Sequence, residues 1–325
     1  TDVESIELTQ PDISKQNPEL YAQYLQGLRD FKQSEHKITY VYFDNSEKNP
    51  SSRVHHIVDL PDSIDVISLS NPVDLADWEL KDIATVRKDK GTKVIFTLDF
   101  DAIKLDYQKM VEDIENMKLE EGEERPEIPS FISVLVETVN NSLASVNKYN
   151  LDGISVAYKG KAVNHMTEDE KKLHITYENA FIKIAQDWQD RNKNKMIVFE
   201  GYPQNLLDKS ILENCEFIVL PVTDAKDASR LSYNINIAAV EGVPQDKFII
   251  ATETTSLDPA DLKTGYWADG TRALQNSAEW ILAPRSGIDI KGIAIKNVNI
   301  DYYNPARAYM YTRNAINTIN PSPKK

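Results

Sequence analysis

Residues 151–200 contain the stretch that decides the fold: LDGISVA at Leu151–Ala157, a polar and apolar mixture at Thr167–Arg191, and MIVFE at Met196–Glu200. Short apolar runs of this kind are typical of parallel strands that are covered on both faces. The segment between them opens with Thr167 and Glu170 at the spacing of a capping box and repeats apolar residues every three or four positions, which predicts an amphipathic helix. The stretch therefore predicts one strand–helix–strand unit of a parallel sheet.

The same alternation extends over most of the chain. Apolar runs predict eight strands, at Ile38–Phe43, Ile64–Leu69, Lys93–Leu98, Leu151–Ala157, Met196–Glu200, Glu216–Leu220, Phe248–Ala251 and Ile293–Val298. Helical periodicity predicts helices at Pro18–Ser34, Leu75–Lys90, Ile103–Leu119, Phe131–Tyr149, Thr167–Arg191, Asp227–Ala239 and Arg272–Leu282. Eight strands with helical segments between most of them match a (β/α)8 TIM barrel, which usually takes about 250 residues plus insertions.

A doubly wound sheet is the competing architecture. It would carry Gly-x-Gly-x-x-Gly after its first strand, and this sequence has no such motif and no break in composition. We therefore expect a single barrel domain over residues 18–325, preceded by an N-terminal tether at residues 1–17. The acidic segment KLEEGEERPEIP, Lys118–Pro129, is expected to be a solvated surface excursion.

Composition excludes several classes of protein. The 325 residues carry a net charge of −14, which disfavours nucleic acid as a partner. No stretch approaches the roughly 20 consecutive apolar residues of a transmembrane segment. Cys215 is the single cysteine, which excludes an internal disulfide framework and a multi-cysteine zinc site, and the five histidines form no metal-binding motif. We expect no metal and no cofactor.

Polar and aromatic residues follow the predicted strands, at the end of a barrel where ligands bind. Aromatic rings stack on the apolar faces of sugars, while amides and carboxylates bind their hydroxyl groups. The candidate glycan-binding residues are Tyr42, Asp44, Asn45, Asp99, Asp101, Tyr202, Thr223, Asp224, Trp267 and Asn297. For each of them, a role in capping or packing is the alternative. The loop Gly265–Thr271, GYWADGT, contributes Tyr266 as a further aromatic.

The segment LDGISVAYKG at Leu151–Gly160 resembles the signature strand of glycoside hydrolase family 18, Asp-Gly-x-Asp-x-Asp-x-Glu. Asp152 and Gly153 match this pattern. The three positions that carry chemistry in the family fall on Ser155, Ala157 and Lys159, none of which is acidic. Alternate residues of a strand face the same side, so all three would face the barrel interior, with Lys159 at the rim.

The resemblance extends over nearly the whole chain, through YFDNSE on the first strand, IDVISLSNP on the second, GTKVIFTLDFD on the third and KGIAIKNVNIDYY on the eighth. The chain is similar to family 18 chitinases and to the glycosidases and endo-β-N-acetylglucosaminidase-like proteins of bacterial glycan-uptake systems. In active members a Tyr follows strand six and an aromatic residue lies on strand eight. Here the aligned positions are Thr223 or Asp224, and Lys296 or Asn297.

The resemblance implies an oligosaccharide or a glycoprotein glycan as partner, with other glycan-uptake proteins as further partners. It also implies an exported protein, held at the cell surface as a lipoprotein. In active members the signature Glu is the general acid and a neighbouring Asp orients the N-acetyl group of the substrate.

Three functions follow from these observations. The missing acids favour a non-hydrolytic protein that binds oligosaccharides containing N-acetylglucosamine or of the N-glycan type. The first alternative is an active glycosidase that uses other carboxylates, Glu200 and Glu253, because both close strands of one barrel. The second alternative is a protein-interaction scaffold without a glycan site.

Overall fold

A closed barrel of eight parallel strands forms the centre of the computed structural model, which describes residues 12–322. Each strand pairs with the next in sequence, and β8 pairs with β1. The strands are β1 (Ile38–Phe43), β2 (Val66–Leu69), β3 (Lys93–Asp99), β4 (Gly153–Tyr158), β5 (Met196–Gly201), β6 (Phe217–Leu220), β7 (Phe248–Glu253) and β8 (Ile290–Lys296). This confirms the predicted (β/α)8 barrel, and all eight predicted strands are present with ends shifted by a few residues.

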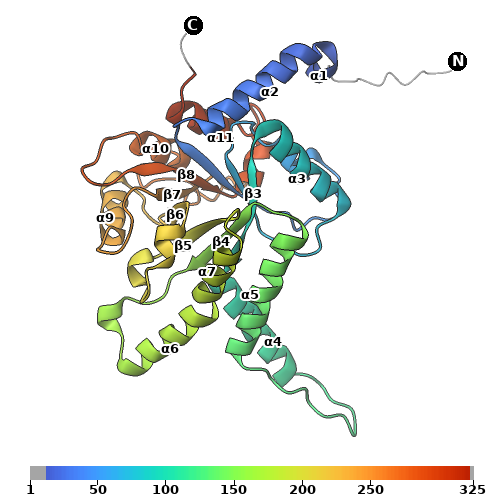
Figure 1. Cartoon of the computed structure of the whole chain (residues 1–325), viewed down its shortest axis with the longest axis vertical. Helices are drawn as coiled ribbons and strands as arrows, with labels where there is room; N and C mark the ends of the chain where they lie inside the picture. Colours follow the sequence, from blue (N-terminus) through green and yellow to red (C-terminus); the bar gives the residue numbers. More distant parts are fainter. Residues whose placement is uncertain (1–11, 323–325) are drawn as a thin grey trace, which may run out of the picture.

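Helices surround the barrel (Figure 1). They are α1 (Ile13–Gln16), α2 (Pro18–Gln33), α3 (Asp77–Lys90), α4 (Phe100–Glu115), α5 (Phe131–Lys148), α6 (Glu168–Ala180), α7 (Ile182–Arg191), α8 (Ile211–Asn214), α9 (Ala228–Ala238), α10 (Ala273–Trp280) and α11 (Met310–Ile319). Short 3-10 turns lie at Arg53–His55, Ile57–Asp59, Val163–His165, Pro203–Asn205 and Val298–Tyr303.

One predicted helix is wrong in its continuity. The segment Thr167–Arg191 forms α6 and α7, which are separated at Phe181, where φ is −127° and ψ is −68°. The ring of Phe181 is fully buried and lies edge-on to Phe100, with ring centroids 5.6 Å apart. The apolar spacing continues through the break because both helices face the same core. The capping box at Thr167 and Glu170 is present as predicted.

The core has two layers, one inside the barrel and one between the strands and the helices. Tyr40, Val198 and Ile249 are among the side chains that fill the barrel interior. Two strand glycines allow close approach of the neighbouring backbone: a Cβ at Gly153 would overlap the Met196 carbonyl, and one at Gly292 would overlap that of Ile38. The interior of the barrel is therefore a packed core, and a ligand must bind outside it.

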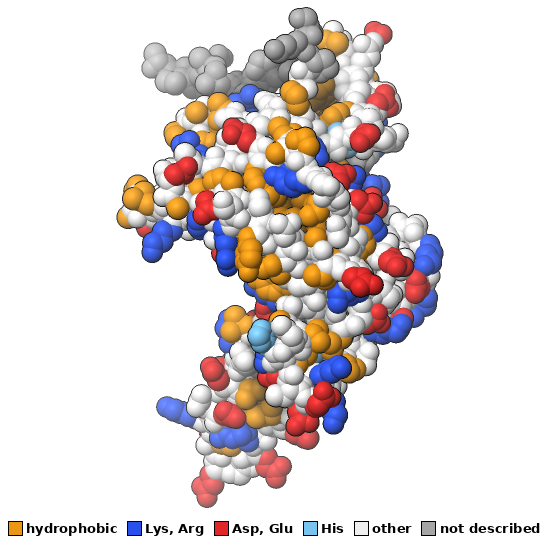
Figure 2. Space-filling model, turned by 90° about the vertical axis from the view of Figure 1, so that its left-hand side faces the viewer, with side chains coloured by type: hydrophobic (Ala, Val, Ile, Leu, Met, Phe, Trp, Pro, Cys, Tyr) orange, Lys and Arg blue, Asp and Glu red, His pale blue; other side chains and the backbone are white. Residues whose placement is uncertain are grey.

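The helices α4 and α5 extend beyond the barrel and are joined by the acidic segment (Figure 1). Residues 118–127 of this segment are exposed, as expected for a surface excursion. Figure 2 shows acidic side chains at the lower end of the molecule, at the height of this connection. Of the predicted tether at residues 1–17, the part up to residue 11 lies outside the described residues. Within residues 12–322, no helix is long and apolar enough to cross a membrane.

Candidate functional site at the barrel mouth

The segment that resembles the family signature lies on β4 and reaches the end of the barrel where the strands have their carboxyl ends. We call this end the mouth. Ser155 is fully buried, Ala157 is partly exposed, and Lys159 follows the strand as an exposed residue. In the strand register, Ala157 lies between Asp99 of β3 and Glu200 of β5. The end of β4 thus contributes no carboxylate, and the acids beside it come from the neighbouring strands.

At the opposite end of the segment, Asp152 and Gly153 contact the neighbouring strands and helix α3. Asp152 Oδ2 accepts a hydrogen bond from the backbone N–H of Val94 at 2.8 Å, and its Oδ1 accepts one from Arg87 at 3.0 Å. Gly153 gives the Met196 carbonyl the space it needs. The two residues that match the family signature therefore have structural contacts at the end of the strand away from the mouth.

Glu200 is the buried carboxylate at the mouth, with 6% of its side chain exposed. Its Oε1 lies 2.9 Å from Nζ of Lys296, and the same ammonium lies 4.5 Å from the ring centre of Tyr42. Burial raises the pKa of Tyr42 well above its ordinary value, and the negative charge of Glu200 raises it further. Within the described chain, neither Glu200 Oε2 nor the Tyr42 hydroxyl has a hydrogen-bond partner. Lys296 therefore closes this part of the mouth with an internal ion pair.

Glu253, the second candidate acid, ends β7. Its Oε1 accepts a hydrogen bond from the backbone N–H of Gly265 at 3.2 Å and lies 3.9 Å from Nζ of Lys226. In the register Glu253 is the neighbour of Lys296, whose ammonium contacts Glu200. The side chain of Lys296 pairs with Glu200, whereas the carboxylate of Glu253 is bound by Gly265 and lies near Lys226, so each candidate acid has a lysine beside it.

A cavity of about 690 Å³ opens beside the mouth, between the loops after β4, β5 and β6 and helix α9. We call it the β5–β6 cavity. Two predicted glycan-binding residues, Tyr202 and Asp224, line it. So does Gln204, whose Oε1 is buried without a hydrogen-bond partner in the described structure. Sequence reasoning missed Gln204 because a lone glutamine after a strand carries no signal of its own.

Several other predicted site residues have bonds within the loops. Asn45 is buried, accepts from Asn71 N–H at 2.7 Å and donates to the Asn71 carbonyl at 2.6 Å. Asp99 caps α4 by accepting from the N–H groups of Asp101 and Ala102. Asp44 caps a turn by accepting from the N–H of Ser46 at 2.9 Å. These contacts are those of capping and loop-holding residues.

The remaining predicted residues are spread around the mouth. Asp101 is exposed in the first turn of α4, and Asn297 is exposed with a left-handed backbone after β8. Trp267 and Thr223 are half-buried and share a small cavity next to β7. Among the residues the structure describes, no group of three or more His, Cys, Asp or Glu side chains is placed to hold a metal ion.

A second cavity, of about 750 Å³, lies between helices α10 and α11 and the loop after β7. We call it the α10–α11 cavity. Of the residues singled out in the sequence, Glu253 and Tyr266 line it. The other lining side chains come from segments that only the folded barrel brings together, so no local pattern marks them.

A closed (β/α)8 barrel with polar residues around the carboxyl ends of its strands places the chain in the class of barrels whose ligand site lies at that end. A model of glycoside hydrolase family 18, BT1044-like, matches residues 1–318. The chain therefore belongs to glycoside hydrolase family 18. No match is found among curated proteins.

Solved structures share the fold at low sequence identity. A selenomethionine-labelled variant of BT1044 superimposes with a TM-score of 0.66 and 20% identity, with 98% of each chain covered. The endo-β-N-acetylglucosaminidase of Cordyceps militaris gives 0.59 and 15%, with 92% of this chain and 96% of that chain covered. A GH18 chitinase of Pseudoalteromonas aurantia gives 0.55 and 13%, with coverages of 87% and 99%. At these identities the likeness concerns the fold.

Proposed function

We propose that this family 18 barrel binds glycans that contain N-acetylglucosamine, including oligosaccharides of the N-glycan type, without hydrolysing them. One observation carries the proposal: Ser155 and Ala157 of β4 and Lys159 after it are not acidic, and the adjacent buried carboxylate, Glu200, is paired with Lys296. Substrate-assisted hydrolysis needs a carboxylic acid to protonate the leaving oxygen and a carboxylate to orient the acetamido group. Neither group is present on this strand.

Lysine is a poor substitute for the general acid. An ordinary lysine has a pKa of about 10.4, far above the range in which a general acid releases its proton readily. Ala157 has no polar atom with which to hold an acetamido group. The strand β4 therefore lies where family members have their catalytic residues, but it has no acidic side chain at the signature positions.

Glycan binding is supported by the β5–β6 cavity. Its volume of about 690 Å³ suits a ligand of a few sugar rings, since small-molecule sites span roughly 300–1,000 Å³. Tyr202 offers an aromatic face, and Asn164, Asn205 and Asn234 offer amide groups for sugar hydroxyls. A mutant of the Cordyceps militaris enzyme has been solved in complex with fucosyl-N-acetylglucosamine-Asn, which shows a glycan on a barrel of this fold.

Calorimetry with a chitooligosaccharide and with an N-glycan tests binding at this cavity. We expect Tyr202→Ala to weaken binding about tenfold, because a sugar ring loses the aromatic face on which it stacks. The matched control is Tyr303→Ala, since Tyr303 is 54% exposed and does not line the cavity. An unchanged affinity in Tyr202→Ala, or no binding of either glycan by the wild type, would contradict the proposal.

An active glycosidase that uses Glu200 and Glu253 is the competing proposal. Both acids lie at strand ends on the mouth side of the barrel, and Glu200 is buried. Hydrolysis by the wild type that disappears in Glu200→Gln or Glu253→Gln would favour it. A protein-interaction scaffold is the third proposal, and it requires that no glycan binds at either cavity.

The family alone suggests where the protein works. We propose an exported lipoprotein at the cell surface that acts with other glycan-uptake proteins. Fractionation of the producing cells tests this location, and recovery of the protein from the cytoplasmic fraction alone would contradict it.

A further inference from the structure

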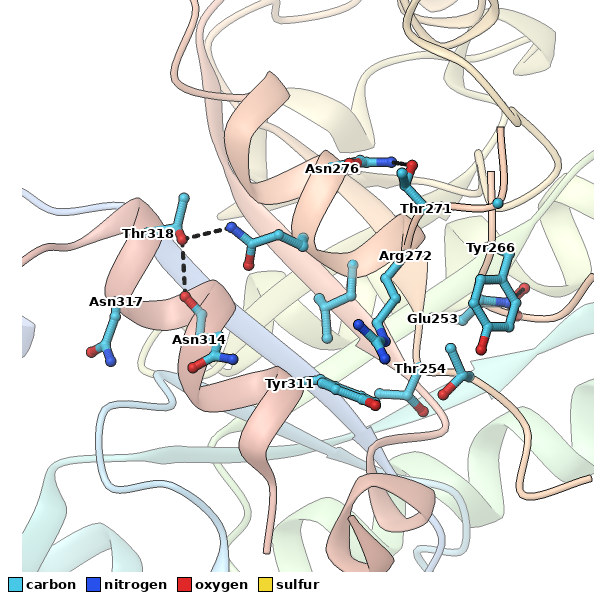
Figure 3. Close-up of a pocket in the computed structure, with 15 residues that line it drawn as sticks. Glu253, Thr254, Tyr266, Thr271, Arg272, Asn276, Tyr311, Asn314, Asn317 and Thr318 are labelled. Atoms are coloured by element: carbon cyan, nitrogen blue, oxygen red, sulfur yellow. Dashed lines mark hydrogen bonds between the residues drawn. The ribbon is translucent and has the colours of Figure 1, made fainter. Parts of the chain in front are cut away.

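The α10–α11 cavity lies outside the barrel mouth, on the flank where α10 and α11 pack side by side (Figure 3). Its walls come from the end of β7, the loop that contains Tyr266, and both helices. The volume of about 750 Å³ is within the range of small-molecule sites. The cavity is therefore large enough for one to three sugar rings.

Uncharged hydrogen-bonding side chains make up most of the lining. They are Thr254, Thr255, Tyr266, Thr271, Gln275, Asn276, Tyr311, Asn314, Asn317 and Thr318. Some of them bond to each other: Gln275 donates to Thr318 Oγ1 at 3.0 Å, and Asn276 donates to Thr271 Oγ1 at 2.5 Å. The side chains of Asn314 and Asn317 make no hydrogen bond within residues 12–322 and are exposed. Amides and hydroxyls of this density suit a ligand rich in hydroxyl groups.

Arg272 is the positive charge of this lining. Its guanidinium lies over the ring of Tyr311, 4.2 Å from the ring centre, and both side chains are at the centre of the view in Figure 3. Within the described chain, its side chain forms no ion pair and no hydrogen bond. Stacking on an aromatic face orients a guanidinium and leaves its edge N–H donors free, which are the donors that bind a carboxylate in bidentate fashion.

Two other arginines have acceptors within the protein. Arg285 also lies over an aromatic ring, that of Trp280 at 3.4 Å, but it donates hydrogen bonds to the carbonyls of Ala283 and Trp280. Arg87 is paired with Asp152. Arg230 also lies over an aromatic ring, that of Tyr233 at 5.1 Å, and lines the β5–β6 cavity. Arg272 lies closer to its ring, at 4.2 Å, and lines the α10–α11 cavity.

Glu253, the acidic residue of the lining, already interacts with groups of the protein. It accepts the N–H of Gly265 at 3.2 Å and lies 3.9 Å from the ammonium of Lys226. In Figure 3 Glu253 lies beside Tyr266, towards the edge of the view, whereas Arg272 faces Tyr311. An anionic group of a ligand would therefore bind at the guanidinium of Arg272.

We propose that the α10–α11 cavity binds an acidic sugar, a sialic or uronic acid residue, with its carboxylate on Arg272 and its hydroxyl groups on the amides of Asn314 and Asn317. The cavity borders the mouth at Glu253, but the proposed ligand contacts, Arg272, Asn314 and Asn317, lie outside the mouth and bind a charge that N-acetylglucosamine lacks. The inference therefore goes beyond the proposed function and does not depend on it.

The test is calorimetry at low ionic strength with sialyllactose, its neutral parent lactose, and a glucuronic acid disaccharide. We expect the wild type to bind at least one of the acidic sugars and to bind lactose at least about tenfold more weakly, since hydrogen bonds to a charged group are the strong ones. The two acidic probes distinguish a sialic from a uronic acid. Binding should weaken as salt is added, because an exposed ion pair is screened.

Variants locate the site. Arg272→Gln is expected to lower affinity for the acidic sugar at least about tenfold. Asn317→Asp, an exposed substitution that places a negative charge in the cavity, should also weaken binding while leaving the fold intact. The matched control is Arg285→Gln, which removes a stacked guanidinium that lines neither cavity. Arg230→Gln removes the stacked guanidinium of the β5–β6 cavity and should leave acidic-sugar binding unchanged. Tyr202→Ala at the β5–β6 cavity should leave acidic-sugar binding unchanged, so the two sites are judged separately.

Three results would overturn the inference. The first is a wild type that binds neither acidic sugar, or binds lactose equally well. The second is an unchanged affinity in both Arg272→Gln and Asn317→Asp. The third is an equal loss in Arg285→Gln or in Arg230→Gln, which would place the anion elsewhere.

Discussion

The two ends of β4 differ in what they do. At the end away from the mouth, Asp152 holds the backbone of Val94 and the side chain of Arg87, and Gly153 lies against the Met196 carbonyl. At the mouth end, the side chains of Ala157 and Lys159 form no hydrogen bond and no ion pair within the described residues, and the contacts of these residues are made by their backbone. Only the first end still matches the family signature. The comparison teaches that the residues which match the family signature are those whose side chain or missing side chain has a structural role in this barrel.

The largest loss of stability is expected from a substitution at Gly153. Gly153→Ala forces a Cβ into the Met196 carbonyl, and we expect it to lower the free energy of unfolding by about 3 kcal/mol or more, since overpacking against backbone leaves little room to relax. Urea denaturation measures this. Gly27→Ala in α2 is the matched control, because nothing lies within 4 Å of its added Cβ and alanine favours a helix. A Gly153→Ala variant as stable as the control would show that this end of β4 does not have the structural role assigned to it.

A smaller loss is expected at the ion pair that closes the mouth. Lys296→Met leaves Glu200 buried without its cation, which we expect to cost about 2 kcal/mol, less than a fully buried pair because 36% of the Lys296 side chain is exposed. The double variant with Glu200→Gln should recover most of the loss in the same denaturation experiment. A double variant no more stable than Lys296→Met would show that the pair itself is not the cause.

The next smaller loss of stability is expected for Asp152→Asn. Asparagine keeps an acceptor for the N–H of Val94 but loses the charge that binds Arg87, so we expect a loss of about 1 kcal/mol that shrinks in high salt. Thermal unfolding at low and high salt measures it. A loss that does not respond to salt would assign the role of Asp152 to its backbone contact instead.

The smallest effect is expected at Ser155. Its hydroxyl is buried without a partner in the described structure, so Ser155→Ala removes an unsatisfied group and should change stability by less than about 1 kcal/mol. Calorimetric unfolding can resolve a change of this size. A large destabilisation would mean that the hydroxyl is bonded in solution and that a position which departs from the family signature also has a structural role.

The sequence predicted the fold because local patterns determine most of it. Eight apolar runs and the helical periodicities are each readable within a window of one element, and a closed barrel is what such a series forms. The helix α11 was missed: Met310–Ile319 is short and carries several Asn and Thr residues, which are poor helix formers. The break at Phe181 was missed because it is set by packing against Phe100 and not by a local breaker.

The site was less accessible from the sequence. Strand-end residues could be named, but whether each one faces a ligand or caps a helix depends on backbone geometry, as Asn45 and Asp99 show. The pairing of Lys296 with Glu200 joins positions 96 residues apart. Likewise, the α10–α11 cavity needs the loop after β7 and helix α11 to be in place together. No sequence window contains these relations.

The most direct test of the central claim follows a chitooligosaccharide and an N-glycan by NMR in the presence of the wild-type protein for a day. The account predicts saturation transfer to at least one glycan and no new reducing-end anomeric signals. New reducing-end signals that are absent from a heat-denatured control and lost in Glu200→Gln would contradict it, and would make this barrel a hydrolase with displaced acids.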